Sequence, residues 1–197
     1  MSRSERSTRT RILDAALTLL ADSDGTGVRM SDIARAAGVS RQAVYLHFAN
    51  RADLLTAATL RLDEVKDSDA RLAASRAATS GEARLAAFIE AWSGYLPEIY
   101  PIARALLAMR DEDAEARAAW DKRMRDMREG CEAAVVALER DGTLNPVFEP
   151  EAAVDLLWTL LSVRNWEHLT QTCGWSQEAY RDGIAGLARE SLVRGRG

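Results

Sequence analysis

The sequence predicts an all-α fold: an N-terminal three-helix domain with a helix-turn-helix, followed by a C-terminal helical bundle, with about nine helices in total. Three observations predict it. Of the 197 residues, 35 are Ala, the residue that costs least to place in a helix, and only 4 are Pro. Apolar residues recur at steps of three and four in most segments. No stretch alternates apolar and polar residues well enough to predict a strand.

The first helix is expected over residues 10–21, which carry an apolar stripe from Ile12 to Leu20. The segment 22–27 is rich in Gly and Asp, and it should end that helix. A short helix then begins with Ser31 as its N-cap and stops at Gly38, a residue that accepts left-handed backbone.

Ser40 is the expected N-cap of a second short helix, over residues 41–47. Two short helices joined through a small residue and a glycine form a helix-turn-helix. Asn50 caps a long helix that is expected to run past Val65. The prolines at 97 and 101 are expected to mark a turn and a first helical turn. The bundle helices are predicted at 82–96, 97–109, 111–141, 150–172 and 177–194.

Charge is unevenly distributed along the chain. Residues 1–51 hold eight Arg and five Asp or Glu, so they carry +3, whereas residues 52–197 carry −7, which together give the net charge of −4. A basic head on an acidic body suggests a nucleic-acid partner for the head. The sequence therefore predicts two domains, a DNA-binding domain over 1–51 and a ligand-binding and dimerisation domain over 52–197.

Composition also limits the cellular setting. No apolar run approaches the ~18 residues that a membrane span needs, and the N-terminus has no apolar signal region. The two cysteines, Cys131 and Cys173, are too few for a disulfide scaffold. We expect a protein of the reducing cytoplasm.

Several motifs of the N-terminal quarter occur in a characteristic order. They are Arg11-Ile-Leu-Asp-Ala-Ala-Leu17, Asp32-Ile-Ala-Arg-Ala-Ala-Gly-Val-Ser40, Tyr45-Leu-His-Phe48 and Arg51-Ala-Asp-Leu-Leu55. This segment, about residues 9–55, resembles the N-terminal domain of the tetracycline-repressor (TetR) family of transcriptional regulators. The family commonly has Lys where this chain has Arg51, so the cation is kept. The resemblance implies a variable all-helical C-terminal domain.

The head should read DNA through its second short helix. A recognition helix presents its N-terminal residues to base edges, and here these include Arg41 and Gln42, which pair with guanine and adenine respectively. Serines at helix N-termini bind phosphates. The resemblance implies base contacts at Arg41, Gln42 and Ala43, and backbone contacts at Tyr45, His47 and Arg51. The expected DNA-binding residues are Ser31, Ser40, Arg41, Gln42, Ala43, Tyr45, His47 and Arg51.

The basic start of the chain, Arg3 to Arg11, is a further candidate for DNA contact, because flexible basic arms enter a flanking groove. The alternative is an N-terminal segment without a binding role.

The resemblance also implies a small-molecule effector pocket in the body. Aromatic and Met side chains in a bundle line apolar cavities, although the same pattern is equally typical of plain core. The candidate pocket residues are Phe88, Trp92, Tyr95, Trp120, Met124, Met127, Trp158, Leu161 and Trp166. Arg104 and Arg164 are candidates for an anionic group of the ligand, or for structural ion pairs.

By the same resemblance, the last two helices form a homodimer interface. Val154, Leu157 and Leu161 on one helix, and Ile184, Leu187 and Leu192 on the other, supply apolar stripes suited to it. A dimer would read both halves of a palindromic operator, whereas one short helix reads too few base pairs.

The sequence thus predicts a ligand-responsive transcriptional regulator, in particular a repressor that a small apolar effector releases from its operator. The alternatives are an activator of the same fold, and a helical ligand-binding or scaffold protein without DNA binding. Catalysis is not expected: His168 and Cys173 fit no zinc or nucleophile motif, and there is no glycine-rich phosphate loop. The sequence predicts neither a metal nor a cofactor.

Overall fold

The computed structural model describes residues 3–22 and 28–195. These residues hold eleven α-helices and one π-helical turn, and no strand beyond an isolated bridge between Leu144 and Val193, so the predicted all-α fold is confirmed. The chain forms two compact units, Met1–Lys66 with Ile99–Met124, and Asp67–Glu98 with Arg125–Gly197. The proposed division at residue 51 stays a prediction.

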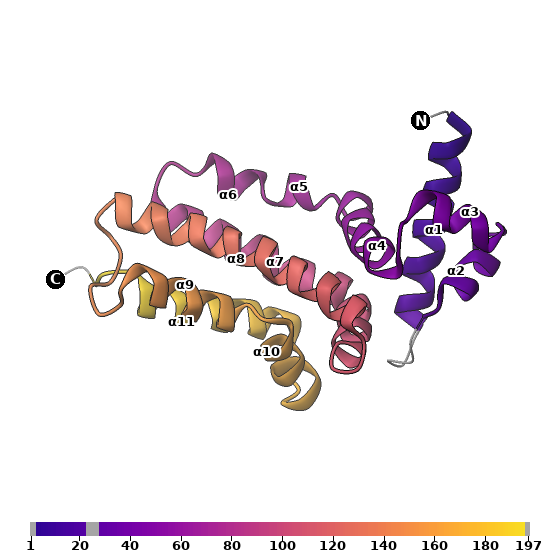
Figure 1. Cartoon of the computed structure of the whole chain (residues 1–197). Helices are drawn as coiled ribbons and strands as arrows, with labels where there is room; N and C mark the ends of the chain where they lie inside the picture. The colour runs from indigo at the N-terminus through magenta and orange to yellow at the C-terminus, as the bar shows by residue number, and fades with distance from the viewer. Residues whose placement is uncertain (1–2, 23–27, 196–197) are drawn as a thin grey trace. The chain divides into compact units, whose positions relative to one another are not determined.

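The first three helices pack together in the first unit (Figure 1). They are α1 (Arg3–Asp22), α2 (Met30–Ala36) and α3 (Arg41–His47). Their shared core includes Ile12, Ile33 and Val44, all fully buried. Gly38 has a φ of +63° in the turn between α2 and α3, which confirms its expected left-handed backbone. Most of the predicted breaker segment, residues 23–27, lies outside the described residues.

α4 (Arg51–Val65) begins as predicted, because the side chain of Asn50 accepts the N–H of Asp53 at 2.8 Å. It does not run past Val65, so that prediction is wrong. Asp67 has a φ of +52°, a left-handed conformation that interrupts the helix and that Asp tolerates better than most residues. Two short helices follow, α5 (Ser68–Arg71) and α6 (Ala73–Ala77).

α7 (Gly81–Met109) is one continuous helix, so the prediction of two helices that meet at Pro97 is wrong. A proline inside a helix removes the N–H that would bond the carbonyl four residues earlier. For Pro97 that carbonyl belongs to Ser93, and it accepts instead from the side-chain amide of Gln177 at 2.7 Å. A long-range side-chain bond thus replaces the missing helical bond.

α8 (Ala114–Arg140) follows the prediction within a few residues. The predicted helix 150–172 is interrupted and forms α9 (Pro150–Leu160), α10 (Val163–Glu167) and a π-helical turn, η1 (His168–Thr172). Ser162 caps α10, and the carbonyls that the break leaves exposed find side-chain donors: Trp92 Nε1 bonds Leu161 O at 2.9 Å, and Asn165 Nδ2 bonds Leu160 O at 2.8 Å.

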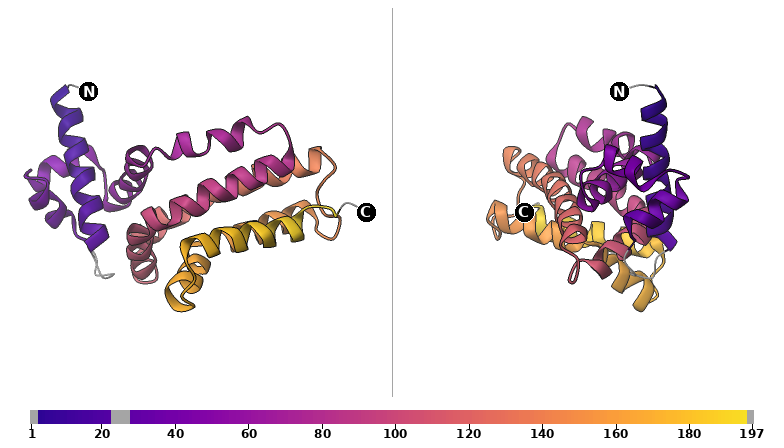
Figure 2. Two further views of the ribbon diagram at one scale, coloured as in Figure 1. Left: turned by 180° about the vertical axis from the view of Figure 1, so that it is seen from behind. Right: turned by 45° about the vertical axis from the view of Figure 1, so that its right-hand side comes forward.

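α11 (Gln177–Leu192) ends within two residues of the predicted helix. It contacts α9 in the second unit, and the two helices run side by side in Figure 1 and again, in orange and yellow, in Figure 2. In the same unit α7 and α8 approach closely, because a Cβ built on Gly130 would lie 2.7 Å from the ring of Phe88. None of the described helices is long and apolar enough to cross a membrane.

Candidate nucleic-acid interface

The predicted recognition helix α3 presents a polar outer face. Ser40 is its N-cap, as expected, and accepts the N–H of Ala43 at 3.1 Å. Arg41 and Gln42 in the first turn are exposed, and the Arg41 guanidinium lies 5.8 Å from the centre of the Tyr45 ring. This stacking holds Arg41 beside an exposed ring, so both side chains lie on the solvent side of the helix.

His47 and Ala43 are half-buried on the same helix, and Phe48, directly after it, is buried. Sequence reasoning missed Leu46, which is 80% exposed in the recognition helix. The helical period turns this position, between Tyr45 and His47, away from the core, and that was the signal in the sequence.

Ser31 does not cap α2, so that prediction is wrong. The N-cap is Arg29, which makes no side-chain capping bond, and Ser31 is half-buried within the first turn. α2 therefore begins two residues earlier than a cap at Ser31 requires. Its start is fixed by the bond from the Ile33 N–H to the Arg29 carbonyl, at 3.1 Å.

A groove of about 710 Å³ runs through the first unit beside α3. It gathers three arginines with hydroxyl and amide side chains from α2, α3 and the start of α4, and two carboxylates from the start of α8. Its lining residues are Val28, Arg29, Met30, Ser31, Arg41, Tyr45, Ala49, Asn50, Arg51, Asp113 and Glu115. Four of the eight predicted DNA-binding residues thus line one groove: Ser31, Arg41, Tyr45 and Arg51.

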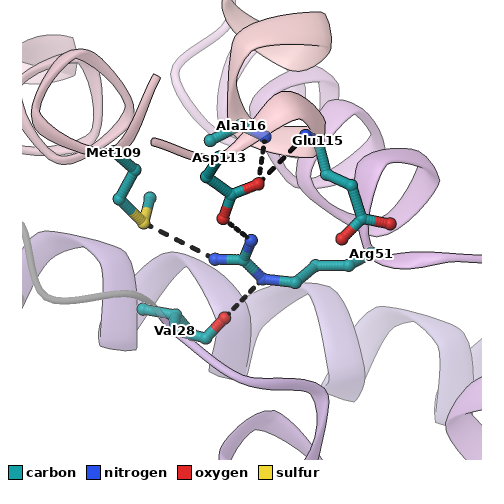
Figure 3. A network of polar contacts seen from close by, with 6 residues as sticks. All are labelled: Val28, Arg51, Met109, Asp113, Glu115 and Ala116. Atoms are coloured by element: carbon teal, nitrogen blue, oxygen red, sulfur yellow. Dashed lines mark hydrogen bonds and ion pairs between the residues drawn. The ribbon is translucent and has the colours of Figure 1, made fainter. Parts of the chain in front are cut away.

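Arg51 occupies the inner part of this groove and has protein partners for its guanidinium (Figure 3). Its Nε donates to the Val28 carbonyl at 2.6 Å, one terminal nitrogen pairs with the Asp113 carboxylate, and the other lies 3.5 Å from the sulfur of Met109. Its side chain is only 13% exposed. Arg51 therefore joins the segment before α2 to the end of α7 and the start of α8.

Asp113 performs two tasks at once. One carboxylate oxygen pairs with Arg51, and the other accepts the N–H groups of Glu115 and Ala116 at 3.0 and 3.1 Å, which caps α8. Burial raises the pKa of Asp113, but these backbone bonds and the Arg51 guanidinium outweigh it and hold the pKa below its usual 3.8. Sequence reasoning gave no signal for this pair, because 62 residues separate its members.

The N-terminal arginines are not an extended arm, since α1 is helical from Arg3. Arg11 donates to the Ala37 carbonyl at 2.8 Å and so satisfies the end of α2, and the Arg9 guanidinium lies 5.2 Å from the centre of the Phe48 ring. These two arginines thus support the fold of the helix-turn-helix.

The nine candidate pocket residues all lie in helices or at helix ends, and most are buried. Phe88, Tyr95, Trp120, Met127, Leu161 and Trp166 are buried, while Trp92, Met124 and Trp158 are half-buried. Several of them have structural partners: the Phe88 ring covers Gly130, and Trp92 meets Tyr95 edge to face at 6.0 Å. None of the nine lines the cavities of about 710, 540 and 300 Å³ described within single units. Arg104 and Arg164 are exposed.

The apolar stripes expected to form a dimer seam are mostly inside the second unit. Val154, Leu157, Leu161, Ile184 and Leu192 are buried within the chain, so the choice of these five is wrong. They fill the contact between α9, α11 and their neighbours in the same chain. Of the six, Leu187 alone is exposed, at 50%.

The His168 and Cys173 side chains come together at the end of η1. The Cys173 sulfur lies 3.6 Å from His168 Nε2, and both residues are exposed. Within residues 3–22 and 28–195 there is no group of three or more His, Cys, Asp or Glu that would hold a metal ion.

Comparison with known proteins agrees with this geometry. Residues 12–58 match the model of a family described as bacterial regulatory proteins, tetR family. The chain is 44% identical over 54 residues to the HTH-type transcriptional regulator AlkX of Mycobacterium tuberculosis. That match spans 27% of this chain and 26% of AlkX, about a quarter of each.

Solved structures resemble almost the full chain. NalD of Pseudomonas aeruginosa, the secondary repressor of the MexAB-OprM multidrug efflux pump, superposes with a TM-score of 0.69 at 23% identity, over 99% of this chain and 100% of NalD. The transcriptional regulator FadR of Bacillus subtilis, in complex with stearoyl-CoA, superposes with a TM-score of 0.72 at 18% identity, over 92% of this chain and 97% of FadR. At these identities the likeness shows the fold. Residues 12–58 thus match the tetR family of bacterial regulatory proteins, and the chain as a whole shares the all-helical fold of NalD and FadR.

Proposed function

We propose that this chain binds a palindromic DNA operator as a homodimer and represses transcription until a small molecule releases it. The observation that carries the proposal is the capped helix α3, whose first turn exposes Arg41 and Gln42 inside the segment that matches the family. An arginine and a glutamine at the N-terminal end of a recognition helix are suited to bidentate contacts with guanine and adenine.

The phosphate contacts we propose surround that helix. Ser31 and Tyr45 line one groove with Arg29 and Asn50, so hydroxyl, amide and guanidinium donors lie within reach of one stretch of sugar-phosphate backbone. Ser40 and His47 complete the set on α3, while Ala43 belongs with Arg41 and Gln42 to the proposed base contacts. Arg51 belongs to it through its place in the groove, although its guanidinium has partners within the protein.

Dimerisation would use the outer face of the last helices. Leu187 and Trp175 are exposed there, at the middle and the start of the α11 region. Two copies joined through this face would carry two recognition helices. Operator binding needs the two helices about 34–36 Å apart, one turn of DNA.

The effector would bind in the body, among the aromatic side chains of α7, α8, α9 and α10. Support comes from the fold, since FadR of Bacillus subtilis, with a similar fold, is in complex with stearoyl-CoA. A ligand that favours one position of α4 would change the spacing of the recognition helices. The effector must bind the two states with different affinity, because equal affinity shifts nothing. Such a regulator would act in the cytoplasm.

The test is a selection of binding sites for the full chain from random double-stranded DNA, at low and at physiological salt. The proposal predicts an enriched inverted repeat, which an Arg41→Ala, Tyr45→Ala variant does not enrich. A folded dimer that enriches no sequence would contradict it and favour the ligand-binding or scaffold alternative. A reporter gene behind the selected site then separates a repressor from an activator by the sign of the change.

The effector claim has its own test. Candidate amphipathic ligands are titrated into the complex of the chain with its selected site, and both ligand binding and DNA affinity are measured. We expect at least one ligand to weaken DNA binding. A ligand that binds the body and leaves DNA affinity unchanged would contradict the proposed coupling.

A further inference from the structure

We infer that Asp113 is a built-in competitor of DNA phosphate for the Arg51 guanidinium, so that the start of α8 sets how much positive charge the DNA-binding groove offers. The inference rests on the proposed function. It assigns a regulatory role to a residue 62 positions away from Arg51 in the sequence and outside the segment that matches the family.

The Arg51 guanidinium already has partners within the protein. It bonds Val28, Met109 and Asp113, so every side of it is directed at the protein (Figure 3). A phosphate that enters the groove meets an arginine whose charge is already compensated by a carboxylate. Two anions, Asp113 and phosphate, are therefore alternatives for the same donors.

Besides Arg51, the charged residues of the groove are two arginines and two carboxylates. Arg29 and Arg41 line it as exposed side chains, whereas Arg51 lies deeper, at 13% exposure. Glu115 lines the groove as a second carboxylate, from the first turn of α8. The start of α8 thus adds negative charge to a surface whose other charged residues are arginines, and it opposes the approach of DNA.

The position of the Asp113 carboxylate depends on the start of α8. One of its carboxylate oxygens is bonded to the N–H groups of Glu115 and Ala116, so the carboxylate is fixed to the first turn of α8. As the Arg51–Asp113 pair does, a second ion pair within the unit joins α4 to α8, from Arg123 on α8 to Asp63 on α4 at 2.7 Å. A displacement of the start of α8 therefore withdraws the carboxylate from Arg51, and the arginine becomes available to phosphate.

The same geometry has an alternative reading with the opposite outcome: the ion pair would position Arg51 and the start of α4 for DNA, and its loss would weaken binding. The burial of Arg51 and the position of its partner inside the groove favour competition, because the carboxylate lies where a phosphate would pair. The two roles therefore predict that removing the Asp113 charge changes the operator affinity in opposite directions.

The experiment measures the affinity of the full chain for its selected operator as a function of salt, for wild type and Asp113→Asn. Asparagine removes the charge and still caps a helix, so α8 keeps its start. Asp111→Asn is the matched control, because it removes the same charge two residues away from Asp113. The Asp111 side chain is 82% exposed and pairs with Arg110. Asp113→Ser, a second neutral cap, serves if the asparagine variant folds poorly; circular dichroism checks the fold of each.

We expect Asp113→Asn to bind the operator more tightly than wild type. Its plot of log affinity against log salt concentration should be steeper by about 0.9 for each bound chain, the change that one added phosphate contact implies. Between 200 and 50 mM salt its advantage should therefore grow roughly threefold per chain. Adding Arg51→Gln should abolish the gain, since the two side chains act as a pair.

Weaker binding by Asp113→Asn, or a change no larger than that of Asp111→Asn, would overturn the inference and leave the proposed function standing. If wild type binds no duplex at either salt concentration, the proposed function fails and the inference fails with it. The wild-type measurement thus separates the two failures.

Discussion

The side-chain amide of Gln177 donates to the backbone carbonyl of Ser93 at 2.7 Å, and this carbonyl is the one that Pro97 leaves without a helical partner. The other end of the same amide accepts the Trp166 indole N–H at 2.8 Å. One glutamine at the start of α11 thus satisfies two groups of the second unit, one on α7 and one on α10.

Replacing Gln177 should therefore destabilise the protein. Gln177→Ala removes the donor to the Ser93 carbonyl and the acceptor for the Trp166 indole N–H, at a cost of about 1–3 kcal/mol for the buried carbonyl alone. Gln177→Glu can still accept from Trp166 but cannot donate to Ser93, so it should lose part of this stability. Urea unfolding measures both, with Gln171→Ala as the control, since Gln171 is exposed and bonds Thr170 alone in the described contacts. Equal stability of Gln177→Ala and the control would contradict the role given to this bond.

The two glycines Gly130 and Gly94 should respond to alanine with opposite signs. A Cβ at Gly130 would lie 2.7 Å from the Phe88 ring, so Gly130→Ala should cost about 1–3 kcal/mol through overpacking. A Cβ at Gly94 meets nothing within 4 Å, so Gly94→Ala should stabilise α7 by up to ~1 kcal/mol. Thermal unfolding of the two variants checks this. A stabilising Gly130→Ala would show that the Phe88 ring has room to move.

The two cysteines should differ in reactivity. Cys173 is exposed, whereas Cys131 is buried and burial raises its pKa to about 12. We expect a thiol reagent to modify one thiol per folded chain at neutral pH, and two after unfolding. Cys173→Ser should abolish the fast reaction. Fast modification of Cys131 in that variant would mean that the second unit opens readily.

The Cys131 pKa also predicts an alkaline effect on stability. Its folded value lies above the unfolded value of 9.0, so the folded state binds the proton more tightly. The contribution is complete below pH 9 and is lost as the pH rises from 9 toward 12. Cys131→Ala should flatten this part of the stability curve, and chemical unfolding across the alkaline range measures the difference. Parallel curves for wild type and variant would contradict it.

Asp113 predicts an effect at acid pH with the opposite sign. Its folded pKa lies below the usual 3.8, so the stability it supplies is present above that value and is lost as the pH falls through the folded pKa. Wild type should therefore exceed Asp113→Asn in stability near neutral pH, and the difference should shrink below about pH 4. Unfolding curves at a series of pH values test this. A difference that is independent of pH would assign the loss to packing instead of charge.

Local signals in the sequence predicted the helix-turn-helix well. Ser40 and Asn50 cap their helices and Gly38 has the left-handed turn, because each of these features is decided within four residues of chain. The same local reasoning misplaced the cap of α2, where the N-cap is Arg29 and no side-chain capping bond is made.

Predictions that depend on distant partners were wrong or absent. Pro97 locally predicts a helix end, but α7 continues through it, and the carbonyl that Pro97 leaves unbonded accepts from Gln177, 84 residues from Ser93. The sequence around Arg51 predicts a DNA contact, and nothing in the sequence near Asp113 indicates that it pairs with Arg51. Apolar periodicity marked Leu157 and Ile184 as packing residues, but it does not say whether the partner helix lies in the same chain or in a second copy.

Base readout by α3 is tested most directly by the affinity of wild type and Gln42→Ala for the selected operator and for its single-base variants. If α3 reads bases, Gln42→Ala should lose about 1–3 kcal/mol of discrimination at one base-pair position in each half-site and keep its discrimination elsewhere. A uniform loss across all duplexes, or a wild-type chain that binds every duplex equally, would contradict base readout by this helix.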